Sequence, residues 1–136
     1  ERRVAIRRFA ARVWPLGSSC GHGTLLPQLH ATRTVLGATA TITGLHTPSG
    51  AVGTLFLGPL LARSFPLALP ECRVWIDLGL ATVVALPSTP TWQMPLPIPA
   101  IPALAGFEIG MQAVWAPTTA VLGFDLTNAV GMRLGD

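Results

Sequence analysis

The chain has 136 residues, the length of a single domain with one hydrophobic core, which argues against a two-domain enzyme with a cleft between its halves. Charged residues make up 11% of the composition and apolar residues 50%, whereas soluble domains carry about 25% charged residues. A surface so poor in charge presents mostly neutral groups, so we expect another molecule to cover part of it. Arginine provides all nine basic residues and the net charge is +3.

A basic arm, residues 1–12, precedes a single domain predicted for residues 13–136. The arm holds five arginines against Glu1, whereas the rest of the chain holds four arginines and five carboxylates. Its β-branched residues and Trp14 favour an extended strand from Val4 to Trp14, although a helix would also gather apolar side chains on one side. The residues assigned to this assembly arm are Arg3, Val4, Ile6, Arg7, Arg8, Phe9, Val13 and Trp14.

The rest of the chain is dominated by period-two alternation of apolar and polar residues, which is typical of half-buried strands. Prolines between alternate residues of segment 92–98 indicate that this strand lies at an edge, because proline cannot donate to a ladder. Eight to ten short strands separated by turn signals predict an all-β, antiparallel β-sandwich of the jelly-roll or Ig-like kind. The expected strands are 29–35, 38–43, 52–57, 73–77, 80–86, 92–98, 107–115 and 130–134, with a helical turn at 102–106.

No transmembrane segment is predicted. The long uncharged runs 34–62 and 78–107 are interrupted by several glycines and prolines, which a spanning helix would not tolerate. No signal peptide is present, and a chain that starts at Glu1 without methionine is compatible with an export signal already removed. The arm shows no regular alternation of aromatic residues with its arginines and resembles no nucleic-acid module, so no nucleic-acid partner is expected.

The two cysteines, Cys20 and Cys72, lie in loop-like surroundings. In an exported protein an even number of cysteines in such surroundings predicts a disulfide, whereas in a cytosolic domain the same residues would be buried thiols. His22 follows Cys20 by two positions, but neighbours in a glycine-rich loop rarely face each other, so a Cys–His nucleophile is not favoured.

Candidate residues for other chemistry are sparse, so we expect no enzyme and no cofactor. The spacing of His22, His30 and His46 matches no metal-binding pattern. Asp77 and Glu108 could form a pair of catalytic carboxylates, as in glycosidases, but solvation or pairing with arginine is the simpler interpretation. The sequence contains no phosphate-binding loop, dinucleotide fingerprint or nucleophile elbow.

The four tryptophans suggest an alternative function in carbohydrate binding, because aromatic rings on a sandwich face stack on sugars. Trp92 and Trp115 are in phase with neighbouring apolar residues and are expected in the core. Trp75 is out of phase with Val74 and Ile76, which makes it the candidate for an exposed, sugar-contacting ring.

The order of several short motifs resembles a cysteine-paired, Leu/Pro/Thr-rich all-β domain found at the C-termini of exported planctomycete-type proteins. The segments that carry this resemblance are 14–21, 26–32, 35–42, 54–58, 70–77, 96–99, 102–106, 112–115 and 126–130. The resemblance implies an exported all-β domain with a disulfide between Cys20 and Cys72 and no catalytic role. The chain departs from the family at Glu71, where the family has glycine, and we expect it to stand alone, whereas the family domain usually follows a larger protein.

These observations together predict an extracellular structural protein, secreted or on the cell surface, that self-assembles into a homopolymer such as a filament, sheath or surface layer. In one form of this hypothesis the arm donates a strand to a neighbouring copy. In the other form the arm pairs with its own sheet. The alternative function is a carbohydrate-binding or cell-surface attachment module, with a polysaccharide as partner.

Overall fold

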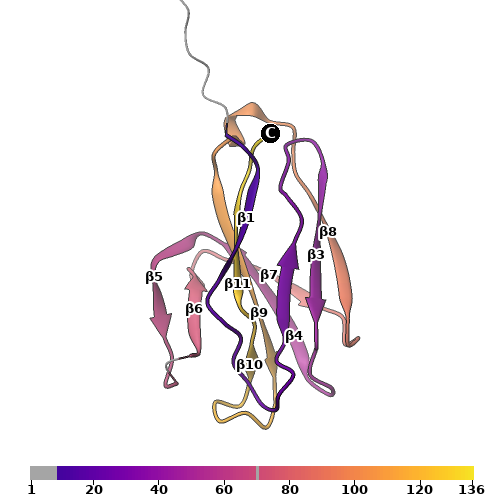
Figure 1. The fold of residues 1–136 in the computed structure, drawn as a ribbon, viewed down its shortest axis with the longest axis vertical. Coiled ribbons are helices and arrows are strands. Elements are labelled where there is room, and N and C mark those ends of the chain that lie inside the picture. Colours follow the sequence, from indigo (N-terminus) through magenta and orange to yellow (C-terminus); the bar gives the residue numbers. More distant parts are fainter. Residues whose placement is uncertain (1–8, 70) are drawn as a thin grey trace, which may run out of the picture.

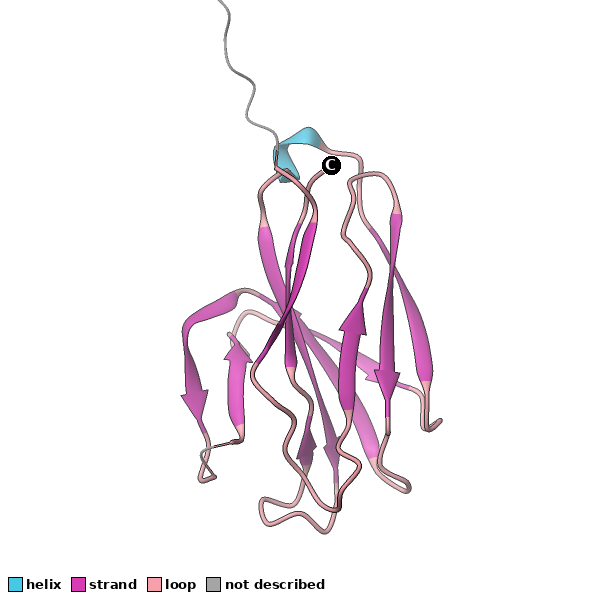
Figure 2. Ribbon diagram, in the orientation of Figure 1, coloured by secondary structure: helices cyan, strands magenta, loops and turns pink. Residues whose placement is uncertain are grey.

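The computed structural model describes residues 9–69 and 71–136, and almost all of its regular structure is β-strand (Figures 1 and 2). The elements in these residues are β1 (Arg12–Leu16), β2 (Gln28–Ala31), β3 (Thr39–Leu45), β4 (Val52–Gly58), β5 (Leu60–Pro66), β6 (Arg73–Ile76), β7 (Thr82–Leu86), β8 (Trp92–Pro97), η1 (Pro102–Leu104), β9 (Glu108–Ala116), β10 (Asp125–Leu126) and β11 (Ala129–Arg133). In this part of the chain no helix is long and apolar enough to cross a membrane.

The strands form three layers with the largest sheet in the middle. The central sheet is antiparallel with the order β1-β11-β9-β4-β7, and β10 pairs with β9 beyond the start of β11. The sheet β2-β3-β8 lies on one side, and the hairpin β5–β6 lies on the other (Figure 1). This arrangement confirms the prediction of an all-β, antiparallel sandwich and adds an outer layer to it.

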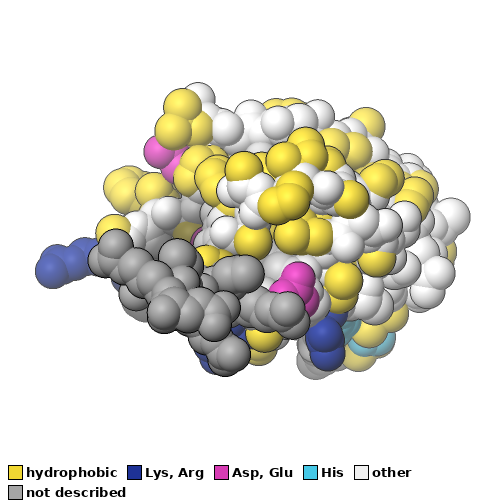
Figure 3. Space-filling view, turned by 90° about the horizontal axis from the view of Figure 1, so that it is seen from above, with side chains coloured by type: hydrophobic (Ala, Val, Ile, Leu, Met, Phe, Trp, Pro, Cys, Tyr) yellow, Lys and Arg dark blue, Asp and Glu magenta, His cyan; other side chains and the backbone are white. Residues whose placement is uncertain are grey.

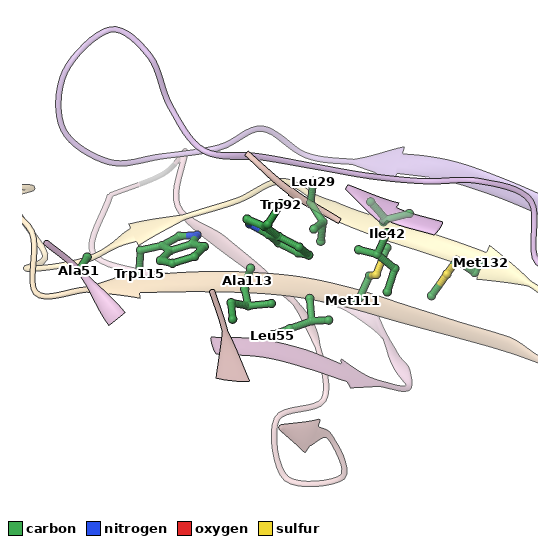
Figure 4. Packing of buried hydrophobic residues seen from close by; sticks show 11 residues of the cluster. Leu29, Ile42, Ala51, Leu55, Trp92, Met111, Ala113, Trp115 and Met132 are labelled. Carbon is green, nitrogen blue, oxygen red and sulfur yellow. The ribbon is translucent and has the colours of Figure 1, made fainter. Parts of the chain in front are cut away.

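The main core lies between the central sheet and the β2-β3-β8 sheet. Alternate residues of β9, Met111, Ala113 and Trp115, point into this core and are at most 1% exposed. Figure 4 shows them packed among side chains of the facing sheet, including Ile42 and Trp92. Burying a large apolar side chain contributes about 1.5–3 kcal/mol, so the period-two pattern of β9 accounts for its central position. Trp92 and Trp115 therefore lie in the core, as predicted.

The hairpin β5–β6 is attached to the opposite face of the central sheet by a glycine and a glutamine of β9. Gly110 has no side chain, which leaves room for Leu60 and Ile76 to pack directly on the sheet. The amide of Gln112, which is 2% exposed, accepts a hydrogen bond from the backbone N–H of Trp75 and donates to the carbonyl of Arg73. Gln112 thus satisfies backbone groups of β6 that the short hairpin leaves unpaired.

Each of the four tryptophans lies against a glycine. The pairs are Trp14 with Gly131, Trp75 with Gly17, Trp92 with Gly44 and Trp115 with Gly53. In all but the second pair the two residues face each other across neighbouring strands. A Cβ atom added to any of these glycines would come within 3.0 Å of the indole ring. Each glycine therefore provides the space that the ring across from it fills.

The two ends of the described chain are joined at one end of the molecule. The backbone N–H of Asp136 donates to the carbonyl of Phe9 over 2.8 Å, and the N–H of Ala11 donates to the carbonyl of Asp136 over 3.0 Å. From there β1 pairs along β11, with Val13 opposite Met132. The segment from Phe9 onward is thus paired with the last strand of its own chain (Figure 1).

The observed strands differ from the predicted ones at a few places. The strand expected at 29–35 ends at Ala31, because the chain then crosses to the central sheet, where the buried Thr34 hydroxyl donates to the carbonyl of Arg133. The strand expected at 80–86 begins at Thr82, because Asp77 and Leu80 form a turn. β5 and β10 were not predicted at all. β8 is an edge strand, as its prolines indicated.

Candidate interaction surface

The residues assigned to the assembly arm fall into two groups. Arg3, Val4, Ile6, Arg7 and Arg8 lie outside the described residues. Phe9, Val13 and Trp14 belong to the domain itself, because they pair with the C-terminal strand of the same chain. A donor strand reaching from Val4 to Trp14 is therefore too long, because its second half is already paired within the same chain.

The predicted disulfide between Cys20 and Cys72 is present, with an S–S distance of 2.07 Å. It joins the segment after β1 to the start of β6, and both residues are at most 3% exposed. Among the described residues no free cysteine remains. A cysteine nucleophile is therefore ruled out for both positions.

Next to the disulfide, Nδ1 of His22 lies 2.9 Å from a carboxylate oxygen of Asp125, within hydrogen-bond distance. Asp125 is 1% exposed, and it also accepts hydrogen bonds from the backbone N–H of His22 and from the hydroxyl of Thr118. A Cβ on Gly21 would overlap this carboxylate. In a catalytic triad the nucleophile hydroxyl bonds to the histidine, whereas here the hydroxyl of Thr118 bonds to Asp125. The cluster therefore holds two loops together and does not form a nucleophile–base–acid chain.

The remaining titratable residues do not gather into a catalytic or metal site in the described ranges. No group of three or more histidine, cysteine or carboxylate side chains is close enough to hold a metal ion there. The carboxylate of Asp77 accepts a hydrogen bond from the N–H of Gly79, and Glu108 lies opposite Arg133 in the β9–β11 register.

Trp75, the predicted sugar contact, is half-buried. Its ring lies against Gly17, and its backbone N–H is bonded to Gln112. The ring therefore packs β6 against the loop after β1. Trp14, also half-buried, has the guanidinium of Arg12 at 5.5 Å from its ring centroid.

A continuous apolar hollow, called here the outer groove, lies beside the β5–β6 hairpin on the outer face of the central sheet. It consists of two adjoining depressions of about 210 and 270 Å³ that share Leu67, Val74 and Leu78. The first depression is floored by residues of β4 and β9, including Phe56 and Val114. This groove was not predicted, because β5 was not predicted; the apolar residues of segment 60–67 were the signal that could have indicated it.

Exposed apolar side chains extend the outer groove over the neighbouring edge of the sheet. Val83 of β7 lies directly opposite Phe56 of β4, so both side chains are on the same face. Val83 is 60% exposed, and Leu78 and Leu80 in the turn before β7 are 50% and 70% exposed. β7 pairs only with β4, so its other edge is unpaired within the described residues. An apolar patch beside an open strand edge is typical of an interaction surface.

A second hollow, called here the seam groove, separates the edge strands β1 and β2. Its two adjoining parts have volumes of about 440 and 570 Å³ and share Pro15 and His30. Arg12 and Arg33 line one part, and hydroxyl and amide groups, including those of Ser18 and Gln28, line the other. The seam groove is thus more polar than the outer groove and carries basic residues on its rim.

In comparisons with known proteins, no family model, curated protein or solved structure matches this chain.

Proposed function

We propose that this protein is an extracellular structural subunit that self-associates through the outer groove and the adjoining edge of β7. The observation that supports the proposal most directly is the exposed apolar patch formed by Leu78, Leu80 and Val83 next to the groove. Burial of apolar area drives most protein association, and the unpaired edge of β7 offers backbone hydrogen bonds in addition.

The composition of the surface supports the same function. Only 11% of the residues are charged, and Figure 3 shows hydrophobic and neutral side chains over most of the face seen from above. Charged side chains normally keep a soluble monomer from associating, so a surface with few of them favours contacts between copies. The Cys20–Cys72 disulfide suits an oxidising compartment outside the cell.

Sedimentation velocity over a range of protein concentrations tests this proposal. We expect oligomers that grow with concentration, and we expect the substitution Val83→Asp to shift the protein to monomer because it places a charge in the apolar contact. Leu25→Asp is the matched control, since Leu25 is 69% exposed in the loop before β2. A wild-type protein that stays monomeric at high concentration would refute self-association.

The second candidate function is carbohydrate binding, and the seam groove favours it more than Trp75 does. The groove is open along the junction of two sheets, and its walls offer hydroxyl, amide and imidazole groups from Ser18, Thr24, Gln28 and His30. Retention on polysaccharide columns tests this function. We expect Gln28→Ala with His30→Ala to reduce retention and Trp75→Ala to leave it unchanged; failure of the wild-type protein to be retained on any polysaccharide would eliminate it.

A further inference from the structure

We infer that the outer groove of one copy receives residues 2–8, the first part of the basic arm, of a second copy. This inference rests on the proposed self-association and names the segment that makes the contact. The groove lies on the outer face of the sandwich, whereas the seam groove opens between the two large sheets. The choice between these two surfaces follows from side-chain chemistry.

The apolar pattern of the arm matches the outer groove. In an extended chain Val4 and Ile6 point to the same side, about 6.6–6.8 Å apart, because alternate residues of a strand share a face. The groove has two adjoining depressions of about 210 and 270 Å³. Each has room for several water molecules, since one water takes up about 30 Å³ in the liquid. Two aliphatic side chains at this spacing would displace that water from apolar walls.

The carboxylates of the domain also direct the arm to this groove. Asp125 is buried against His22, and neither Glu108 nor Asp136 lines the groove. Asp77, in contrast, lines the outer groove itself.

Glu71 is a second carboxylate of the β5–β6 hairpin, although it does not line the groove. It is exposed in the turn between β5 and β6, next to Cys72, whose carbonyl is bonded to the groove residue Leu67. Arg63 of β5 is exposed as well, and the guanidinium of Arg73 is bonded to the neutral Ser64 and keeps its charge, so these two arginines balance the two carboxylates. The outer groove is therefore near neutral, in contrast to the basic seam groove, and the carboxylate of Asp77 is available to the arginines flanking Val4 and Ile6.

The charge of the seam groove makes it unsuited to the arginine-rich arm. Arg12, Arg33 and His30 line it, and none of its lining residues is a carboxylate. An arginine-rich segment placed there would meet like charges, which disfavours the contact.

Disulfide trapping with the full chain tests the inference. Ile6→Cys and Leu78→Cys are prepared as separate variants, mixed, and oxidised mildly. We expect a cross-linked dimer containing one chain of each variant, identified by mass. Mixing Ile6→Cys with Leu25→Cys is the matched control and should give little cross-link. The native Cys20–Cys72 bond is at most 3% exposed, so it is protected from exchange during the experiment.

The charge on the rim is tested separately. Asp77→Asn should lower the yield of the cross-linked dimer about two- to five-fold, the effect of one exposed ion pair, and added salt should do the same. Asp136→Asn, which removes a carboxylate at the opposite end of β11 from the groove, should leave the yield unchanged.

The outcomes separate the two proposals. If the wild-type chain forms oligomers but Ile6→Cys links to Leu78→Cys no better than to Leu25→Cys, the arm does not occupy the groove and self-association stands. If the chain is monomeric in sedimentation, the proposed function fails. A link formed only within a single chain carrying both Ile6→Cys and Leu78→Cys would show that the arm folds onto its own groove, and this would also overturn the inference.

Discussion

Replacing Gly53 with alanine tests the packing of tryptophan on glycine most sharply. The added Cβ would lie within 3.0 Å of three ring carbons of Trp115. Trp115 is 1% exposed and is packed on all sides in the main core, so its ring has no free space to move into. Overpacking of this kind costs about 1–3 kcal/mol. The better strand propensity of alanine offsets about 0.5–1 kcal/mol of this cost, so we expect a net loss of about 0.5–2 kcal/mol in the free energy of unfolding.

Gly131→Ala makes the same chemical change where the ring is free to move. Gly131 faces Trp14, which is half-buried on the edge strand β1. The ring can rotate toward solvent, with loss of the contact to Arg12, worth about 0.5–1 kcal/mol. That loss is close to what alanine gains in strand propensity. We expect almost no change in stability for Gly131→Ala, although both variants add one methyl group opposite a tryptophan.

Urea unfolding of the oxidised proteins, followed by tryptophan fluorescence, measures both variants. Gly79→Ala is the control, because a Cβ at this position would meet only the Asp77 carboxylate at 3.4 Å. The expected order of stability is Gly79→Ala and Gly131→Ala near the wild type, with Gly53→Ala clearly below them. Equal losses for Gly53→Ala and Gly131→Ala, or no loss for Gly53→Ala, would refute the argument that burial of the ring decides the cost.

Three further predictions follow from the contacts that hold the layers together. Gln112→Ala leaves backbone groups of β6 without partners and should cost about 2–4 kcal/mol in urea unfolding; a smaller loss would show that water replaces the amide. Reduction of the disulfide, which spans a sequence separation of 52 residues, should lower stability by about 4 kcal/mol, measured by unfolding with and without reductant. Deleting residues 1–8 should leave the melting temperature unchanged, since β1 and the backbone hydrogen bonds that join Phe9 and Ala11 to Asp136 remain. A large decrease would show that the arm belongs to its own sheet.

The period-two pattern was sufficient to predict the strands that face the main core. β3 buries alternate residues, and alternate residues of β9 and β11 point into the main core although both strands are buried on both faces. The hydrophobic effect acts directly on that alternation. β5 was missed because Arg63, Ser64 and Pro66 interrupt its apolar residues, and its pairing with β6 is irregular. Local sequence does not show that a second strand will cover such a segment.

The interaction surface was harder to predict, because it is built by pairing between distant segments. The Trp–Gly contacts depend on strand register, which places Gly53 opposite Trp115 although they are far apart in the chain. The outer groove likewise combines residues of β4, β6 and the loop after β9. Composition predicted that some surface would be available for contacts, but only the sheet order shows where that surface lies.

The joining of both chain ends at one end of the sandwich has a mechanical consequence. A pulling force applied between Phe9 and Asp136 would act across the antiparallel pair β1–β11 from the end at which the two residues are bonded. Such a load breaks the hydrogen bonds of the ladder one after another instead of all together, so the two strands would peel apart at low force. Peeling would proceed along β1 toward Cys20, where the covalent bond to Cys72 ties the chain to the outer hairpin. The disulfide would then carry the load, and the segment between Cys20 and Cys72 would be shielded from further extension.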